Sequence, residues 1–296
     1  LPCAANQTST STSTELAQCF LLSPAYGLTR AASAQVWRDA QANELEHWLR
    51  NAAPSLGDNA ALHASGFQQY VAVKDLVEKE GHGWGRVLEL GAGPYTHTLP
   101  MFAAAQTSLA TLESVTFVDP LADEYLARVA RVAYREQRSV QVAPGVHKPV
   151  HVLKASAEEA QFLLRDKGFD TVVMVNALEF CANAWEAMQT AYSKLRPGGV
   201  LVFHEAAHDD EGGRGRADGD ARRALKLRRA AIDRFLSHFQ TAFRVDISRE
   251  AGWKWGSTGV HFVGVKPKEA KPDTPRTWAA WVTSWAASTF KGTGGS

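Results

Sequence analysis

The sequence has few of the residues that build disulfide frameworks and metal sites. There are 3 cysteines among 296 residues, Cys3, Cys19 and Cys181, and their spacing matches no zinc or iron–sulfur pattern. The formal net charge is only +1, so no strong overall field directs the chain towards nucleic acid or a membrane surface. No apolar run approaches the roughly 20 residues that a membrane-spanning helix needs. We therefore expect neither nucleic acid as a partner nor a membrane segment in this chain.

The remaining composition is that of a globular protein. Hydrophobic residues make up 45% and charged residues 21%, which is enough apolar material for a sizeable core. Residues 1–27 differ, because they are rich in serine and threonine and are expected to form a stem or disordered arm. A Cys3–Cys19 bridge and a glycan on the N-Q-T pattern at Asn6 would favour the secretory lumen or an organelle. Two unpaired thiols on a disordered stem would instead suit a cytoplasmic protein.

Three further regions follow the arm. Residues 28–84 carry apolar side chains at helical spacing and are predicted to form an N-terminal helical cap. Residues 85–268 alternate Val- and Leu-rich runs with helical segments, which is typical of parallel strands joined by crossover helices. Residues 269–296 form a Trp-containing tail, which would pack on the domain or offer a partner surface. The predicted fold class is α/β: a doubly wound, Rossmann-like sheet, mostly parallel with an antiparallel last strand, with helices on both faces and extra N-terminal helices.

Within the α/β region the pattern predicts one helix over residues 121–137 and another over residues 221–239. The last two strands, "FRVDIS" and "GVHFVGVKP", are expected to pair antiparallel. No strand is predicted between residues 138 and 147.

The residues that end the first two strands form the strongest local signal. In a doubly wound sheet, ligands bind at the carboxyl ends of the strands. Gly91 and Gly93 follow the first strand and allow a tight turn that a ligand can approach closely. Asp119 ends the second strand, 28 residues beyond Gly91, where a carboxylate can accept hydrogen bonds from ribose hydroxyls.

Five stretches in this order carry a resemblance to a known family. They are "VLELGAGPYTHTL", "VTFVDPLADEY", "LKASAEEA", "FDTVVMVNALEF" and "LRPGGVLVFHE". Together they resemble the successive motifs of class I S-adenosylmethionine-dependent methyltransferases, over roughly residues 85–266. The resemblance implies S-adenosylmethionine as cofactor and S-adenosylhomocysteine as product, and it leaves the acceptor open.

The resemblance also implies roles for residues at the strand ends. The first turn would lie beside the methionine part of the cofactor, Asp119 and Pro120 beside the ribose, the next loop beside the adenine, and the end of the following strand under the sulfur. The residues so assigned are Glu89, Gly91, Ala92, Gly93, Asp119, Pro120, Ser156, Ala157, Glu158, Asn176 and Ala177. Two positions depart from the family pattern: Tyr95 stands near the usual third glycine, and Ser156 stands where an acid is common. The lack of that third glycine also argues against a dinucleotide fold.

A second pattern, His204-Glu205-Ala206-Ala207-His208, spells the HExxH signature of zinc peptidases. Zinc binding through this signature needs both histidines on one face of a helix. The apolar run before His204 predicts a strand, so no metal is expected. A zinc-dependent hydrolase and a non-catalytic scaffold with the cofactor fold are the alternatives.

The favoured hypothesis is O-methylation of a hydroxyl on a small molecule or glycan. A hydroxyl needs a base, and histidine titrates near neutral pH, so His204 is the first candidate, with Glu205 orienting it or binding acceptor hydroxyls. His97 is a further catalytic candidate, and His208 and Glu179 are lesser ones. Four side chains of the N-terminal helices could cover the acceptor: Trp37, Glu44, His47 and Trp48. The oligomeric state is left open.

Overall fold

The structure is a computed structural model that describes residues 31–51, 69–78, 81–105, 109–206, 221–225, 227–247 and 259–268. Several predictions of the sequence lie outside these residues: the arm with Cys3, Asn6 and Cys19, the imidazole of His208, and the Trp-containing tail. Among the described helices, none has the length and apolar character needed to cross a membrane.

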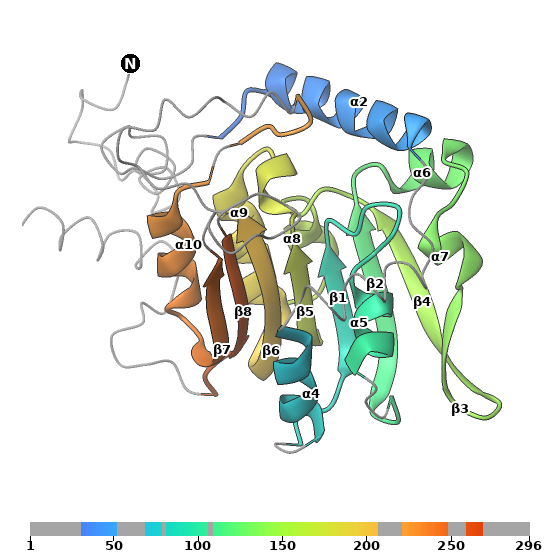
Figure 1. Cartoon of the computed structure of the whole chain (residues 1–296), viewed down its shortest axis with the longest axis vertical. Helices are drawn as coiled ribbons and strands as arrows, with labels where there is room; N and C mark the ends of the chain where they lie inside the picture. Colours follow the sequence, from blue (N-terminus) through green and yellow to red (C-terminus); the bar gives the residue numbers. More distant parts are fainter. Residues whose placement is uncertain are drawn as a thin grey trace, which may run out of the picture.

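Eight strands form one sheet in the order β3-β4-β2-β1-β5-β6-β8-β7 (Figure 1). The central strands β4, β2, β1, β5 and β6 run parallel, whereas β3, β8 and β7 are antiparallel to their neighbours. The strand bounds are β1 Gly85–Leu90, β2 Leu112–Asp119, β3 Ser139–Ala143, β4 Val146–Lys154, β5 Phe169–Val175, β6 Leu195–Ala206, β7 Gln240–Ile247 and β8 Gly259–Val265. The predicted fold class is confirmed, including the antiparallel end of the sheet.

Helices cover both faces of the sheet and the edge where the parallel strands end. Their bounds are α2 Ala34–Arg50, α4 Gln69–Glu78, α5 Thr98–Ala105, α6 Ala122–Arg128, α7 Ala133–Glu136, α8 Ala160–Leu163, the short 3-10 turn η3 Leu178–Phe180, α9 Ala184–Lys194 and α10 Arg229–Leu236. In Figure 1, α2 (blue) crosses the carboxyl ends of the strands, while α4 lies near their opposite ends.

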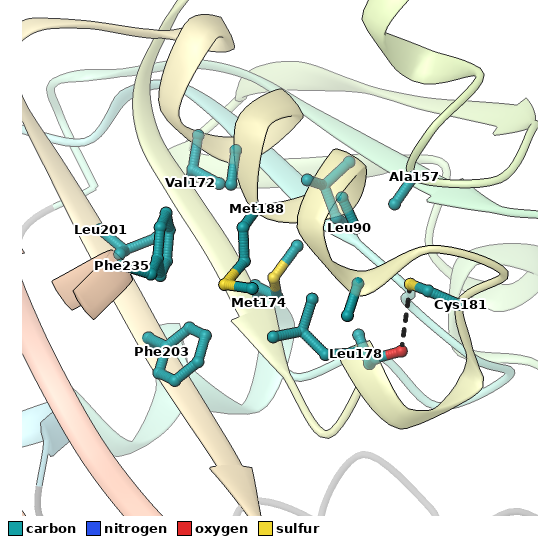
Figure 2. Packing of buried hydrophobic residues seen from close by; sticks show 14 of the residues in the cluster. Leu90, Ala157, Val172, Met174, Leu178, Cys181, Met188, Leu201, Phe203 and Phe235 are labelled. Atoms are coloured by element: carbon teal, nitrogen blue, oxygen red, sulfur yellow. Dashed lines mark hydrogen bonds between the residues drawn. The ribbon is translucent and has the colours of Figure 1, made fainter. Parts of the chain in front are cut away.

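Alternation along the strands divides the core into two layers, because successive side chains of a strand point to opposite faces. Leu201 and Phe203 of β6 pack with Met188 of α9 and Phe235 of α10 on one face (Figure 2). Val200 and Val202 of the same strand belong to the other layer, together with side chains of α4, α5 and α7. Burial of such side chains contributes about 1.5–3 kcal/mol each, so the two layers fix which residues of β6 face which helices.

The predicted helix over residues 121–137 is two helices, α6 and α7, separated by extended backbone at Val129 and Val132. Both valines are buried, so tertiary packing overrides the helical pattern there. The Arg135 side chain donates to the carbonyl of Tyr125 at 3.0 Å and satisfies the end of α6. The break also lets Ala133 N donate to Pro94 O at 2.8 Å, which ties this segment to the turn after β1.

Two other elements differ from the sequence prediction. Strand β3 was not predicted; it forms a hairpin with β4, and its turn contains Gly145 with a φ of 75°. The Pro144-Gly145 pair is a turn signal that could have revealed it. The helix predicted over residues 221–239 is shortened to α10, because Ala224 N and Leu225 N donate to the carbonyl of Glu179 instead of forming helical bonds.

Candidate cofactor and acceptor site

The turn after β1 is bonded to the end of β2. Gly91 N and Ala92 N donate to the carbonyl of Val118 at 2.9 and 3.2 Å, and Gly93 N donates to Oδ2 of Asp119 at 2.9 Å. The two features that the sequence singled out, the glycine turn and the strand-ending aspartate, therefore meet at one point of the sheet edge.

Gly91 and Gly93 serve this turn in different ways. Both have a positive φ, 72° at Gly91 and 56° at Gly93, in the region that favours glycine. A Cβ on Gly91 would lie 2.5 Å from the Cβ of Ala177, so this glycine lets the end of β5 approach the turn. Among the described residues, a Cβ on Gly93 would meet only the Tyr95 ring, at 3.6 Å, and Gly93 is partly exposed.

The Asp119 carboxylate is held by two backbone N–H groups. In addition to Gly93 N, it accepts from Leu121 N at 2.8 Å, and the intervening Pro120 has no N–H. Burial raises the pKa of Asp119 to about 6, although both N–H donors act in the opposite direction. A carboxylate has about four acceptor positions, so two remain for hydroxyl donors.

Glu89 shapes the turn from inside the protein. Its carboxylate accepts from His97 N at 2.7 Å, from Thr98 N at 3.1 Å and from the Thr96 hydroxyl. Burial raises its pKa, opposed by these donors. Glu89 thus fixes the beginning of α5 and the path of the turn, and a direct contact with a cofactor remains a prediction.

The loop after β4 lies beside the same edge, since Ala155 N donates to the carbonyl of Asp119 at 3.3 Å. Ser156 and Glu159 bond reciprocally between side chain and backbone, and Ser156 and Ala157 are buried. Glu158 accepts from Asn183 N through Oε1 at 2.7 Å. Its buried Oε2 has no hydrogen-bond partner within the described residues, which leaves one carboxylate acceptor in this loop.

The end of β5 carries an exposed polar side chain. Asn176 has a φ of 51°, and its N–H donates to the carbonyl of His204 at 2.8 Å, which turns its side chain out of the sheet. The following N–H groups, of Ala177 and Leu178, donate to Oε1 of Glu205 at 2.6 and 2.8 Å. Glu205 therefore positions the turn into η3.

His204 and Glu205 lie in β6 and point to opposite faces of the sheet. The helical arrangement that HExxH needs is thus absent at His204 and Glu205, and the described residues contain no cluster of three metal-binding side chains. Because of the opposite orientation, Glu205 cannot orient the His204 imidazole as expected. Burial raises the pKa of Glu205 to about 8.

The His204 ring packs against that of His261 of β8, with centroids 4.2 Å apart. Burial and, to a smaller extent, His261 hold the pKa of His204 well below its ordinary value, and burial lowers that of His261 to about 4. His204 is therefore neutral at pH 7, because its imidazole binds a second proton only weakly. His261 was missed by the sequence prediction, because its place opposite His204 depends on the pairing register of β6 and β8.

Helix α2 and residues 221–225 cover the edge where these groups meet. Trp37 Nε1 and Gln41 Nε2 both donate to the Phe180 carbonyl at 3.1 Å. Arg223 forms an ion pair with the buried Glu179 at 2.8 Å, and Arg222 lies 3.6 Å from Glu44. The Trp48 ring contacts the ring of Tyr95, and the Tyr95 ring in turn contacts the ring of the buried His97.

The order and direction of the strands define a Rossmann-like α/β protein whose candidate site lies at the carboxyl ends of β1, β2, β4 and β5. A family model described as "Methyltransferase domain" matches residues 37–255, well over half of the chain. The chain belongs to this family, the S-adenosylmethionine-dependent methyltransferases of the class I fold, and its methyl donor is S-adenosylmethionine.

Two solved structures are similar to this chain at low sequence identity, and the first of them shows the same fold. The [4+2]-cyclase SpnF is 19% identical, with a TM-score of 0.52, and the match covers 82% of this chain and 99% of that one. The N-methyltransferase NodS from Bradyrhizobium japonicum WM9, in complex with S-adenosyl-L-homocysteine, is 17% identical, with a TM-score of 0.47 and coverage of 77% and 98%. A search of curated protein sequences gave no significant match.

The residues at this edge fit the cofactor that the family implies. The Asp119 carboxylate keeps acceptor positions for ribose hydroxyls, Glu158 Oε2 is a buried acceptor within the loop expected beside the adenine, and Gly93 presents partly exposed backbone. No side chain projects from Gly91 or Gly93 towards such a ligand.

Proposed function

We propose that this protein transfers the methyl group of S-adenosylmethionine to a hydroxyl of a small molecule or glycan. The bond between Gly93 N and the Asp119 carboxylate supports the donor half of this proposal, because it brings the glycine turn and the ribose acceptor to one point. When bound, the donor supplies an electrophilic methyl carbon: its C–S bond breaks as a C–O bond forms, and the hydroxyl proton passes to a base.

The chain contributes position and proton handling. Asp119, Glu158 and the turn at Gly91–Gly93 would hold the donor, while Asn176 stands exposed at the end of β5 beside them. Fixing the two reactants within about 3–3.5 Å is the main source of acceleration in such a displacement. Aromatic and polar side chains of α2, among them Trp48, suit the recognition of a small molecule with hydroxyl groups.

His204 is our candidate for the base. Its imidazole is neutral at pH 7 and lies at the carboxyl half of β6, next to Val175 of β5. Its lowered pKa keeps the ring in the neutral form that can accept a proton, and makes it a weaker base than an exposed imidazole. His97, at the beginning of α5, is the second candidate.

The test is a transfer assay with the full chain, isotope-labelled methyl donor and separate panels of hydroxyl- and amine-bearing small molecules and glycans. The proposal expects label in a methyl ether, identified by mass spectrometry. Label only in methylated amines would refute the hydroxyl acceptor and leave the methyltransferase assignment intact. Replacing His204 by Asn should leave binding of S-adenosylhomocysteine unchanged and slow turnover at least about 100-fold, the usual contribution of a general base.

A further inference from the structure

Three side chains from two distant segments form a cluster against the turn after β1. Trp48 and Tyr95 have ring centroids 5.1 Å apart, and Trp48 Nε1 donates to Oε1 of Glu44 at 2.6 Å. Glu44 and Trp48 lie one helical turn apart on α2, and the Glu44 side chain is only 14% exposed. The Glu44–Trp48–Tyr95 cluster thus combines two aromatic rings with one carboxylate under α2.

The cluster borders the donor site described above. Tyr95 follows Gly93 by two residues, and its ring carbon Cε1 lies 3.6 Å from the point where a Gly93 side chain would begin. Gly93 is the residue whose N–H binds Asp119. On its other side the Tyr95 ring meets His97, at 5.2 Å in an edge-to-face arrangement. The ring therefore flanks the turn at which the donor is expected to bind.

The charges around Tyr95 are mostly negative. Burial is the main reason for its raised pKa, and the carboxylates of Glu44, Glu89 and Asp119 raise it further, whereas Arg222 acts in the other direction. These negative charges disfavour ionisation of Tyr95 to a phenolate, and they favour a positive charge next to the two rings. Aromatic faces attract cations most strongly where water is excluded.

We propose that the Glu44–Trp48–Tyr95 cluster recognises the positive sulfonium of the methyl donor and so distinguishes the donor from its product. S-adenosylmethionine carries this charge, whereas the sulfur of S-adenosylhomocysteine is a neutral thioether of otherwise equal structure. The inference rests on the donor site of the proposed function. It predicts that transfer of the methyl group weakens binding, which favours release of the product.

The test compares the dissociation constants of the two ligands by isothermal titration with the full chain. Tyr95→Leu removes a ring, Tyr95→Phe keeps the ring, and Glu44→Gln removes the charge but keeps an acceptor for Trp48 Nε1. The ratio of the product's to the donor's dissociation constant should fall about 2- to 30-fold in Tyr95→Leu and several-fold in Glu44→Gln, the range of a cation–π contact. Tyr95→Phe should keep the ratio of the wild type.

A donor analogue in which a carbon that bears a primary amine replaces the methylsulfonium group provides an independent readout. It is cationic, and its affinity should fall in Tyr95→Leu in parallel with that of the donor. Equal weakening of cationic and neutral ligands in Tyr95→Leu and Glu44→Gln would overturn the inference while leaving the donor site intact. Absence of binding of either ligand to the wild type would overturn the donor site itself. Circular dichroism of each variant checks folding. If Tyr95→Leu does not fold, the ratio of the two dissociation constants in Glu44→Gln tests the inference.

Discussion

As the proposed ribose acceptor, Asp119 is expected to couple cofactor binding to pH. Its pKa is raised to about 6, so the carboxylate is ionised above that pH and carries a proton below it. Ribose hydroxyls need the ionised form as acceptor. We predict that the dissociation constant of S-adenosylhomocysteine is flat above about pH 7 and rises up to about tenfold per pH unit below about 6. Isothermal titration across this range measures the effect.

Asp119→Asn should bind weakly and show a much flatter profile. The matched control is Asp123→Asn on α6, whose side chain is 67% exposed and whose nearest cation, Lys154, is 3.7 Å away. A pH profile that is the same in the wild type and in Asp119→Asn would show that another group causes it.

Gly91 tests the close approach of β1 and β5. Gly91→Ala should lower the free energy of unfolding by about 2–5 kcal/mol, because it adds a left-handed alanine and a contact of 2.5 Å with Ala177. Gly145→Ala has a similar φ, 75°, and no described residue lies within 4 Å of its new Cβ, so it should cost only about 1–2 kcal/mol. Urea unfolding compares the two, and equal losses would mean that the contact with Ala177 relaxes without cost.

At the scale of residues, the sequence predicts the features that depend on a short stretch of chain. The meeting of the Gly91–Gly93 turn with Asp119 could be predicted, because it follows from the ends of consecutive strands, whereas their roles in cofactor binding stay predictions. The His204–His261 contact could not, since it depends on a register between strands more than fifty residues apart. The opposite orientation of Glu205 does follow from the alternation of a strand, and it was overlooked because the pair was treated as one motif.

At the scale of elements, α2 is anchored by two bonds to a single carbonyl. Gln41→Ala removes the 3.1 Å bond to the Phe180 carbonyl and leaves that of Trp37. We predict a loss of about 0.5–1.5 kcal/mol in the free energy of unfolding and faster amide exchange over α2. Gln35→Ala is the control, because the Gln35 side chain is exposed and, within the described part of the chain, bonds only to Asp39 and Arg38 of its own helix. Equal exchange in both variants would show that α2 is held by other contacts.

Element boundaries were the least predictable part of the fold. The helical period of residues 121–137 continues through Val129 and Val132, yet these valines adopt extended backbone and pack in the core. Residues 221–225 carry a helical pattern and instead donate to the Glu179 carbonyl. In both cases a tertiary contact outweighs a local preference worth a few tenths of a kcal/mol per residue.

At the scale of the whole molecule, the cofactor should stabilise the fold. The proposed donor site joins β1, β2, the loop after β4 and the end of β5, so a ligand bound there would link four strands. We predict that S-adenosylhomocysteine at about 100 times its dissociation constant adds about 2.7 kcal/mol and raises the melting temperature by roughly 5–10 °C. Scanning fluorimetry measures this, with NADH as the control. An equal rise with NADH would contradict the specificity of the site.

The sheet as a whole was predictable because alternating strands and crossover helices leave few topologies. The β3–β4 hairpin has a local signal in the Pro144-Gly145 turn, but the covering of the site by residues 221–225 was not predictable, since it depends on contacts that a pattern along the chain does not contain.

The alternation of β6 gives two adjacent residues separate surroundings. His204 lies on the side of His261, whereas Glu205 holds the N–H groups of Ala177 and Leu178 on the other side. In a double-mutant cycle, His204→Asn and Glu205→Gln should therefore be additive in unfolding free energy within about 0.5 kcal/mol. Neighbours joined by one peptide bond would then behave as thermodynamically independent sites, and either could change without compensation by the other.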